Sequence, residues 1–83
     1  MKGIVFGLGS IGRRHGRNLR ALGVGVAGFD PDPDRREAFA SEVAGSDVHA
    51  SVEDALQVSA EFAVIASPNA FHLKQALACA RIG

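Results

Sequence analysis

Short apolar segments alternate with longer amphipathic segments along the whole chain. The apolar segments are of strand length and are bounded by turn residues, and the first is apolar throughout, as in a strand buried on both faces. This alternation is typical of β-α-β units, in which helices cover a parallel sheet. The predicted strands are Gly3 to Phe6, Gly25 to Phe29, the residues around Asp47 to His49, and Phe62 to Ala66.

The amphipathic segments predict helices. The first has small residues on one stripe and arginines on another, and it stops at Gly23. A Pro-Asp-Pro turn leads into the second, which Asp32 or Asp34 caps, and Ser51 caps the third. The predicted helices are Ser10 to Leu22, Arg35 to Ala44, Ala55 to Val58 and Ala70 to Ile82.

A glycine motif, G-x-G-x-x-G, follows the first strand and opens the first helix. Gly7 permits the tight turn, Gly9 leaves room for a pyrophosphate to approach the backbone, and Gly12 lets helix and strand pack closely. The N–H groups at the helix start favour anions. We therefore predict a Rossmann-type α/β fold with sheet order 3-2-1-4. Its predicted phosphate-binding residues are Gly7, Gly9, Ser10, Ile11 and Gly12.

Asp30 ends the second strand at about the 20-residue spacing that the dinucleotide fingerprint requires. We predict that it accepts hydrogen bonds from the adenosine ribose and repels a 2′-phosphate, which favours NAD over NADP. Arg35 and Arg36 compete with this interpretation, because either could reach back to a 2′-phosphate. A purely structural alternative makes Asp30 a cap of the turn that follows it.

The chain contains the glycine motif followed by Arg13, Arg14 and His15, then Phe29-Asp30, then Ala63 to Asn69, and His72. Taken together, these motifs resemble the Gfo/Idh/MocA family, the glucose-fructose oxidoreductases, inositol dehydrogenases and their relatives. The resemblance implies that a cluster after the fourth strand lines the nicotinamide end of the cofactor: Ser67, Pro68, Asn69 and His72. An alternative interpretation makes Ser67 and Asn69 helix caps and Pro68 a first-turn proline.

The resemblance covers only the first part of such an enzyme. Family members continue into a fifth strand that ends in a Glu-Lys-Pro motif with the catalytic lysine, and then into a substrate domain. Residues 1–83 are therefore expected to form an incomplete dinucleotide-binding domain without catalytic residues of its own. The implied parent enzyme transfers a hydride between a nicotinamide cofactor and a sugar, cyclitol or related alcohol. The fragment alone is expected to be inactive.

The composition limits the other possibilities. The 83 residues allow one small domain, and 47% hydrophobic with 22% charged residues indicate a packed core. Nine basic residues balance nine acidic ones, and no apolar segment is long enough for a signal peptide or a membrane span. We expect no nucleic-acid or membrane partner. The single Cys79 suits a reducing cytoplasm.

The remaining polar residues predict little chemistry. His15 is expected to pack near the glycine motif, and His49 has no predicted role. No histidine pair has metal-ligand spacing, so no metal is predicted. The arginines of the first helix are interpreted as a solvated face, because no aromatic residue lies among them to stack a base. They are Arg13, Arg14, Arg17 and Arg20.

Two other functions remain open. The chain could be a NAD-sensing module without catalysis, although the residues at the nicotinamide position favour an enzyme. It could also be a methyltransferase that binds S-adenosylmethionine, although that class need not keep Gly12 in dinucleotide register. The fourth strand is an apolar edge if its neighbour is missing, so we also expect the isolated chain to self-associate.

Overall fold

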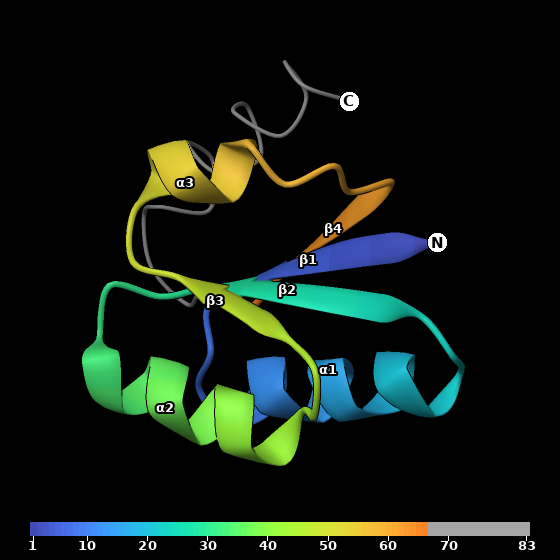
Figure 1. Ribbon diagram of the computed structural model, residues 1–83. Helices are drawn as coiled ribbons and strands as arrows, with labels where there is room; N and C mark the ends of the chain where they lie inside the picture. The colour runs from blue at the N-terminus through green and yellow to red at the C-terminus, as the bar shows by residue number, and fades with distance from the viewer. Residues whose placement is uncertain (67–83) are drawn as a thin grey trace.

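A computed structural model describes residues 1–66. The predicted parallel sheet is confirmed: its four strands lie in the order β3-β2-β1-β4, and every neighbouring pair is parallel. Figure 1 shows α1 and α2 on one face of this sheet and α3 on the other. The strands are β1 (Lys2–Phe6), β2 (Gly25–Phe29), β3 (Asp47–His49) and β4 (Phe62–Ile65), and the helices are α1 (Ser10–Ala21), α2 (Pro33–Glu42) and α3 (Val52–Leu56).

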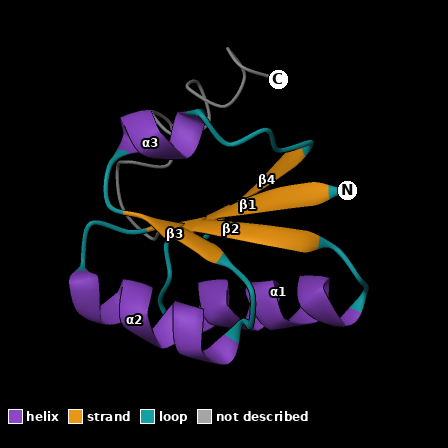
Figure 2. Ribbon diagram, viewed as in Figure 1, coloured by secondary structure: helices purple, strands orange, loops and turns teal. Residues whose placement is uncertain are grey.

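The core has two layers, one on each face of the sheet, and Figure 2 shows the helices that cover the two faces. Strands β1 and β2 contribute alternate residues to each layer, because successive side chains of a strand point to opposite faces. Between the sheet and α1 and α2 lie Val5, Leu8, Val26, Phe39 and Val43. On the α3 face lie Ile4, Phe6, Ala27, Phe29 and Ala55.

Two helices begin earlier than the sequence predicted. Helix α2 begins at Pro33 because the Asp32 carboxylate caps it by accepting from the Asp34 N–H at 2.9 Å. Proline is well tolerated at the first helical position, where its missing N–H costs no hydrogen bond. Helix α3 begins directly after Ser51, whose hydroxyl accepts from the Asp54 N–H at 3.2 Å.

The other predicted boundaries agree with the structure to within one residue at each end, except that α2 stops at Glu42 and α3 at Leu56. The last predicted helix, Ala70 to Ile82, lies outside the described residues. Within the described part, β4 forms one edge of the sheet beside β1, as expected. No described helix has the length and hydropathy that a membrane span requires.

Candidate dinucleotide-binding site

The glycine motif forms the connection between β1 and α1. Gly7 has a φ of 96°, a conformation that residues with a side chain rarely adopt, so glycine is required at this turn. Its N–H donates to the Phe29 carbonyl oxygen of β2 at 2.9 Å. The turn therefore starts at the carboxyl ends of the two central strands, where ligands bind in open α/β sheets.

The next two glycines of the motif have opposite surroundings. A Cβ atom at Gly12 would overlap the carbonyl oxygen of Gly7, so glycine is needed there for the close packing of α1 on the turn. A Cβ atom at Gly9 would have no atom of the described chain within 4 Å. Among residues 1–66, therefore, nothing fills the space in front of Gly9, which the approach of a pyrophosphate requires to be open.

Helix α1 begins at this open space. Gly9 is its N-cap, no side chain caps it, and its first turn contains no acidic residue. Unpaired N–H groups and the positive end of the helix dipole are thus left for an external anion. The predicted residues Ser10 and Ile11 occupy the first turn, and both are exposed.

Asp30 lies at the carboxyl end of β2 and is only 4% exposed. One carboxylate oxygen accepts from the Leu8 N–H at 2.9 Å, and the other accepts from the Asp32 N–H at 2.9 Å. The structural interpretation of Asp30 as a turn cap is therefore correct, and it is compatible with ribose binding. An ionised carboxylate has about four acceptor positions, so two of them are left over.

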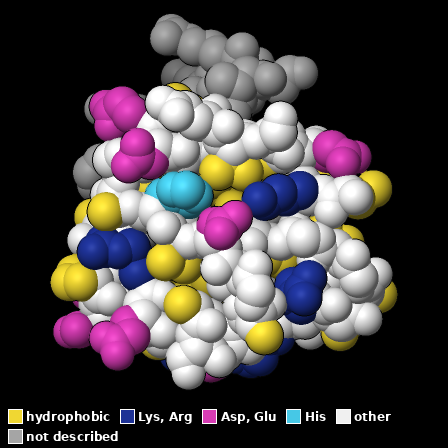
Figure 3. Space-filling model, viewed as in Figure 1, with side chains coloured by type: hydrophobic (Ala, Val, Ile, Leu, Met, Phe, Trp, Pro, Cys, Tyr) yellow, Lys and Arg dark blue, Asp and Glu magenta, His cyan; other side chains and the backbone are white. Residues whose placement is uncertain are grey.

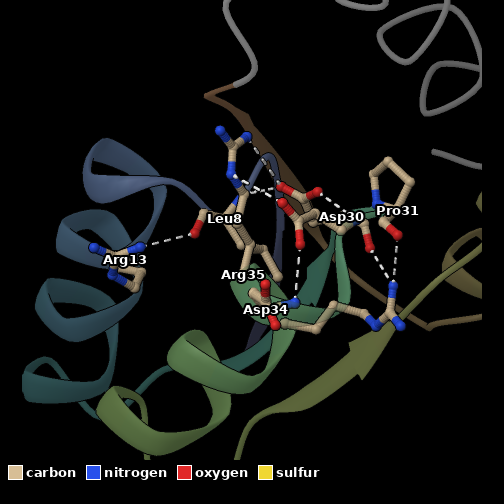
Figure 4. Close-up of polar contacts among 8 residues, drawn as sticks. Leu8, Arg13, Asp30, Pro31, Asp34 and Arg35 are labelled. Carbon is tan, nitrogen blue, oxygen red and sulfur yellow. Dashed lines mark hydrogen bonds and ion pairs between the residues drawn. The ribbon is translucent and has the colours of Figure 1, made fainter.

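The two arginines near Asp30 differ in their contacts, and Figure 4 shows Arg35 beside Asp30. The Arg36 guanidinium donates to the Asp30 and Pro31 carbonyl oxygens, at 2.9 and 3.0 Å, and so stabilises the turn. The Arg35 side chain is 53% exposed and makes only long ion pairs, at 3.8 Å, with the carboxylates of Asp30 and Asp32. Of the two guanidinium groups, only that of Arg36 is held by hydrogen bonds within residues 1–66.

The structure thus brings together one part of the predicted site. Gly7, Gly9 and Gly12 of the loop lie at the same edge of the sheet as Asp30 and Arg35. The residues that the resemblance places at the nicotinamide lie outside the described residues; they are Ser67, Pro68, Asn69 and His72. Strand β4, which precedes them, pairs with β1 up to Ile65, opposite Phe6.

Two residues beside the loop were missed by the sequence reasoning. The Leu8 carbonyl oxygen accepts from the Arg13 guanidinium at 3.3 Å, and Arg13 Nε lies 2.7 Å from a carboxylate oxygen of Glu42 on α2. Arg17 also pairs with Glu42. The interpretation of the four arginines as a solvated face is therefore wrong for Arg13, which is partly buried because α2 packs beside α1. Arg17 is exposed, as expected, although it pairs with Glu42. No spacing in the sequence indicates this contact.

The remaining titratable groups add no assigned chemistry to the site. His15 is half-buried in α1. The His49 carbonyl oxygen accepts from the Asp30 N–H at 3.2 Å, while its Nε2 atom is buried without a hydrogen-bond partner in residues 1–66. The described residues contain no group of three potential metal ligands. Acidic and basic side chains are interspersed on the face shown in Figure 3.

Comparison with solved structures gives two informative matches. The WlbA dehydrogenase from Chromobacterium violaceum, solved in complex with NADH and UDP-GlcNAcA, matches 100% of this chain with a TM-score of 0.88 and 25% identity. A probable dehydrogenase from Thermotoga maritima matches 99% of the chain with a TM-score of 0.85 and 22% identity, a level that shows a shared fold. This chain therefore has the Rossmann-type fold found in these two dehydrogenases.

The predicted resemblance to Gfo/Idh/MocA-type enzymes is thereby confirmed at the level of the structure. No family model matches the sequence, and no curated protein matches it significantly. The 83-residue chain covers 25% of the length of each of the two dehydrogenases. The likeness therefore concerns the dinucleotide-binding portion of these enzymes.

Proposed function

We propose that the chain is the NAD-binding part of a Gfo/Idh/MocA-family oxidoreductase. The observation that carries this proposal is the contrast within the glycine motif, where Gly12 is closed in by the turn and Gly9 faces open space. That space lies at the uncapped start of α1 and on the side of the sheet where β2 ends in Asp30. A purely structural glycine turn has no need of the opening at Gly9.

The residues present fit a nicotinamide dinucleotide. The N–H groups of the first turn of α1 would bind the pyrophosphate, and Asp30 would accept from the adenosine ribose hydroxyls. Arg35 would cover the adenosine end from its exposed position beside Asp30. The nicotinamide supplies the hydride acceptor or donor. In the parent enzyme the residues from Ser67 to His72 would line that end of the cofactor.

The reaction class follows from the resemblance. We propose that the parent enzyme moves a hydride between the cofactor and a carbon of a sugar, cyclitol or related alcohol. The WlbA dehydrogenase, which is similar over this whole chain, was solved with NADH and UDP-GlcNAcA, and this supports a sugar-derived substrate. A sensor function has no comparable support.

Calorimetric titration of the full chain with NAD and NADP tests the cofactor assignment. We expect NAD to bind more tightly, because the Asp30 carboxylate repels a 2′-phosphate. Asp30→Asn should narrow the difference, since it removes the charge but keeps an oxygen that can accept from the Leu8 N–H. Absence of NAD binding at millimolar concentration to the folded chain would contradict the proposed function.

Substitutions of Arg35 and Arg36 test the competing prediction, that the chain prefers NADP. Arg35 reduces the negative potential at Asp30, so Arg35→Ala should increase the preference for NAD. Arg36→Ala is the matched control, because the Arg36 guanidinium is held by two carbonyl oxygens of the turn. If the unsubstituted chain instead prefers NADP, and Arg35→Ala removes that preference, then NAD is the wrong cofactor.

A further inference from the structure

The peptide units around Leu8 are held by two side chains of opposite charge (Figure 4). The Leu8 N–H donates to the buried Asp30 carboxylate at 2.9 Å, and the Leu8 carbonyl oxygen accepts from Arg13 Nη1 at 3.3 Å. The Leu8 side chain is fully buried, and a Cβ atom at Gly28 would lie 2.9 Å from it. Leu8 is thus fixed through its side chain and both of its backbone polar groups.

This anchoring bears directly on Gly9. The Leu8 carbonyl belongs to the same planar peptide unit as the Gly9 N–H, so holding the one orients the other. Gly9 has no side chain and faces open space, so no packing of its own fixes its conformation. The Gly9 carbonyl oxygen accepts from the Arg13 N–H at 2.9 Å in the first turn of α1. On the other side of Gly9, the Arg13 guanidinium is the side chain that holds the peptide unit of the Gly9 N–H, through the Leu8 carbonyl oxygen.

Arg13 is itself positioned by α2. Its Nε atom lies 2.7 Å from Glu42 Oε2, while the other Glu42 oxygen pairs with Arg17. The Arg13 side chain is 25% exposed and the Glu42 side chain 38%, so both are partly shielded from water. A chain of contacts thus runs from the end of α2 through Arg13 to the peptide between Leu8 and Gly9.

We propose that Glu42, acting through Arg13, is a positioning residue of the phosphate-binding loop. The proposal rests on the proposed function, because it assigns Glu42 to the same dinucleotide site. Glu42 itself does not touch the cofactor. Its carboxylate carries the same sign of charge as a pyrophosphate, so its Coulombic effect alone disfavours binding. Positioning and charge therefore predict opposite effects when Glu42 is removed.

The first test titrates the full chain and its variants with NAD and with inorganic pyrophosphate by calorimetry. Glu42→Ala is expected to raise the dissociation constants of both ligands by roughly three- to tenfold. This is the range expected when one hydrogen bond is lost, here the one from Arg13 to the Leu8 carbonyl oxygen. Glu42→Gln keeps the length of the side chain and an oxygen close to Arg13 but removes the charge of the ion pair, so it should restore only part of the affinity. Glu37→Ala is the matched control, since Glu37 is exposed on the same helix and carries the same charge. The affinity of the Glu37→Ala variant for both ligands should stay unchanged or rise slightly.

Equal or tighter binding by Glu42→Ala, as by Glu37→Ala, would overturn the proposal, because the charge effect alone would then explain the result. Equal weakening by both variants would overturn it as well. Failure of the parent chain to bind NAD would count against the proposed function, and the second test separates the two cases.

The second test needs no ligand. Amide NMR of the free chain should show the Gly9 signal displaced in Glu42→Ala and in Arg13→Ala, with Glu37→Ala at the parent position. The chemical shift of the Gly9 N–H depends on the hydrogen bond that the Leu8 carbonyl oxygen of the same peptide unit accepts. A loss of stability elsewhere in the folded chain would leave this chemical shift unchanged. A Gly9 signal that stays in place in a folded Glu42→Ala chain would contradict the positioning role.

Discussion

Helices α1 and α2 lie side by side on one face of the sheet, yet their N-termini are built differently. Helix α2 starts with the Asp32 cap, Pro33 in its first turn and the acidic Asp34. Helix α1 starts at Gly9, without a capping side chain or an acid. The chain thus satisfies one helix start with its own carboxylates and leaves the other for an anion from outside.

The difference shows how binding competes with stability in this fold. The positive end of a helix dipole is stabilised by a negative charge, commonly by about 0.3 to 1 kcal/mol. Helix α2 has this contribution in the free chain. Helix α1 receives it only when an anion such as a pyrophosphate is bound, so the ligand supplies a contribution that the sequence omits.

The largest effect is expected at Gly12, where the start of α1 meets the turn. Gly12→Ala places a methyl group against the Gly7 carbonyl oxygen, so α1 or the turn must move. We expect the free energy of unfolding to fall by about 3 kcal/mol or more, beyond the usual range of overpacking. Urea denaturation measures this. Gly9→Ala is the matched control and should cost no more than about 1 kcal/mol. Equal losses in both variants would remove the distinction between the two glycines.

The next effect concerns the open space at Gly9. Gly9→Val should leave the chain folded, because a Cβ atom there meets nothing within 4 Å and the φ of −72° suits any residue. The substitution should raise the dissociation constant of NAD by roughly 100-fold or more, which corresponds to a loss of about 2.7 kcal/mol of binding free energy. Calorimetry on the folded variant measures it. Unchanged affinity would place the phosphates elsewhere.

Much of this fold could be predicted from the sequence, because strong local patterns determine it. The apolar segments predicted the strands, and the glycine motif predicted the Rossmann-type strand order and the positions of Gly7 and Gly12. The sequence did not indicate that the Asp30 carboxylate would be buried against the Leu8 N–H. That hydrogen bond depends on how closely the loop approaches β2.

The contacts between α1 and α2 could not be predicted from the sequence either. A Cβ atom at Gly16 of α1 would meet the side chains of Phe39 and Val43 in the α2 region. The pairing of Arg13 with Glu42 has the same origin. Both depend on where α2 lies relative to α1, which no periodicity within either helix specifies.

A smaller effect is expected at the closed helix start. Asp32→Ala removes the acceptor for the Asp34 N–H and should lower the free energy of unfolding by about 1 kcal/mol. Thermal and urea denaturation measure the loss. Asp34→Ala is the comparison variant, since Asp34 contributes only its charge to the first turn and should cost less. A larger loss in Asp34→Ala would show that capping is not what distinguishes α2.

The smallest effect comes from giving α1 the kind of cap that α2 has. Gly9→Asp should raise the free energy of unfolding by a few tenths of a kcal/mol, because aspartate is a somewhat better N-cap than glycine. The same change should eliminate NAD binding, since the new carboxylate occupies and repels the pyrophosphate position. Denaturation and calorimetry on one sample measure both. Retained NAD affinity would show that this helix start is not the anion site.

The most direct measurement of the central claim is an NMR titration of the full chain with NAD, following the backbone amides at the two helix starts. We expect the signals from Gly7 to Gly12 to shift in a saturable manner, and those of Asp34 and Arg35, at the start of α2, to shift less than the loop. In Gly9→Asp no loop signal should respond. Larger shifts at the start of α2 than in the glycine loop, or loop shifts that persist in Gly9→Asp, would contradict the assignment of the uncapped start of α1 as the dinucleotide site.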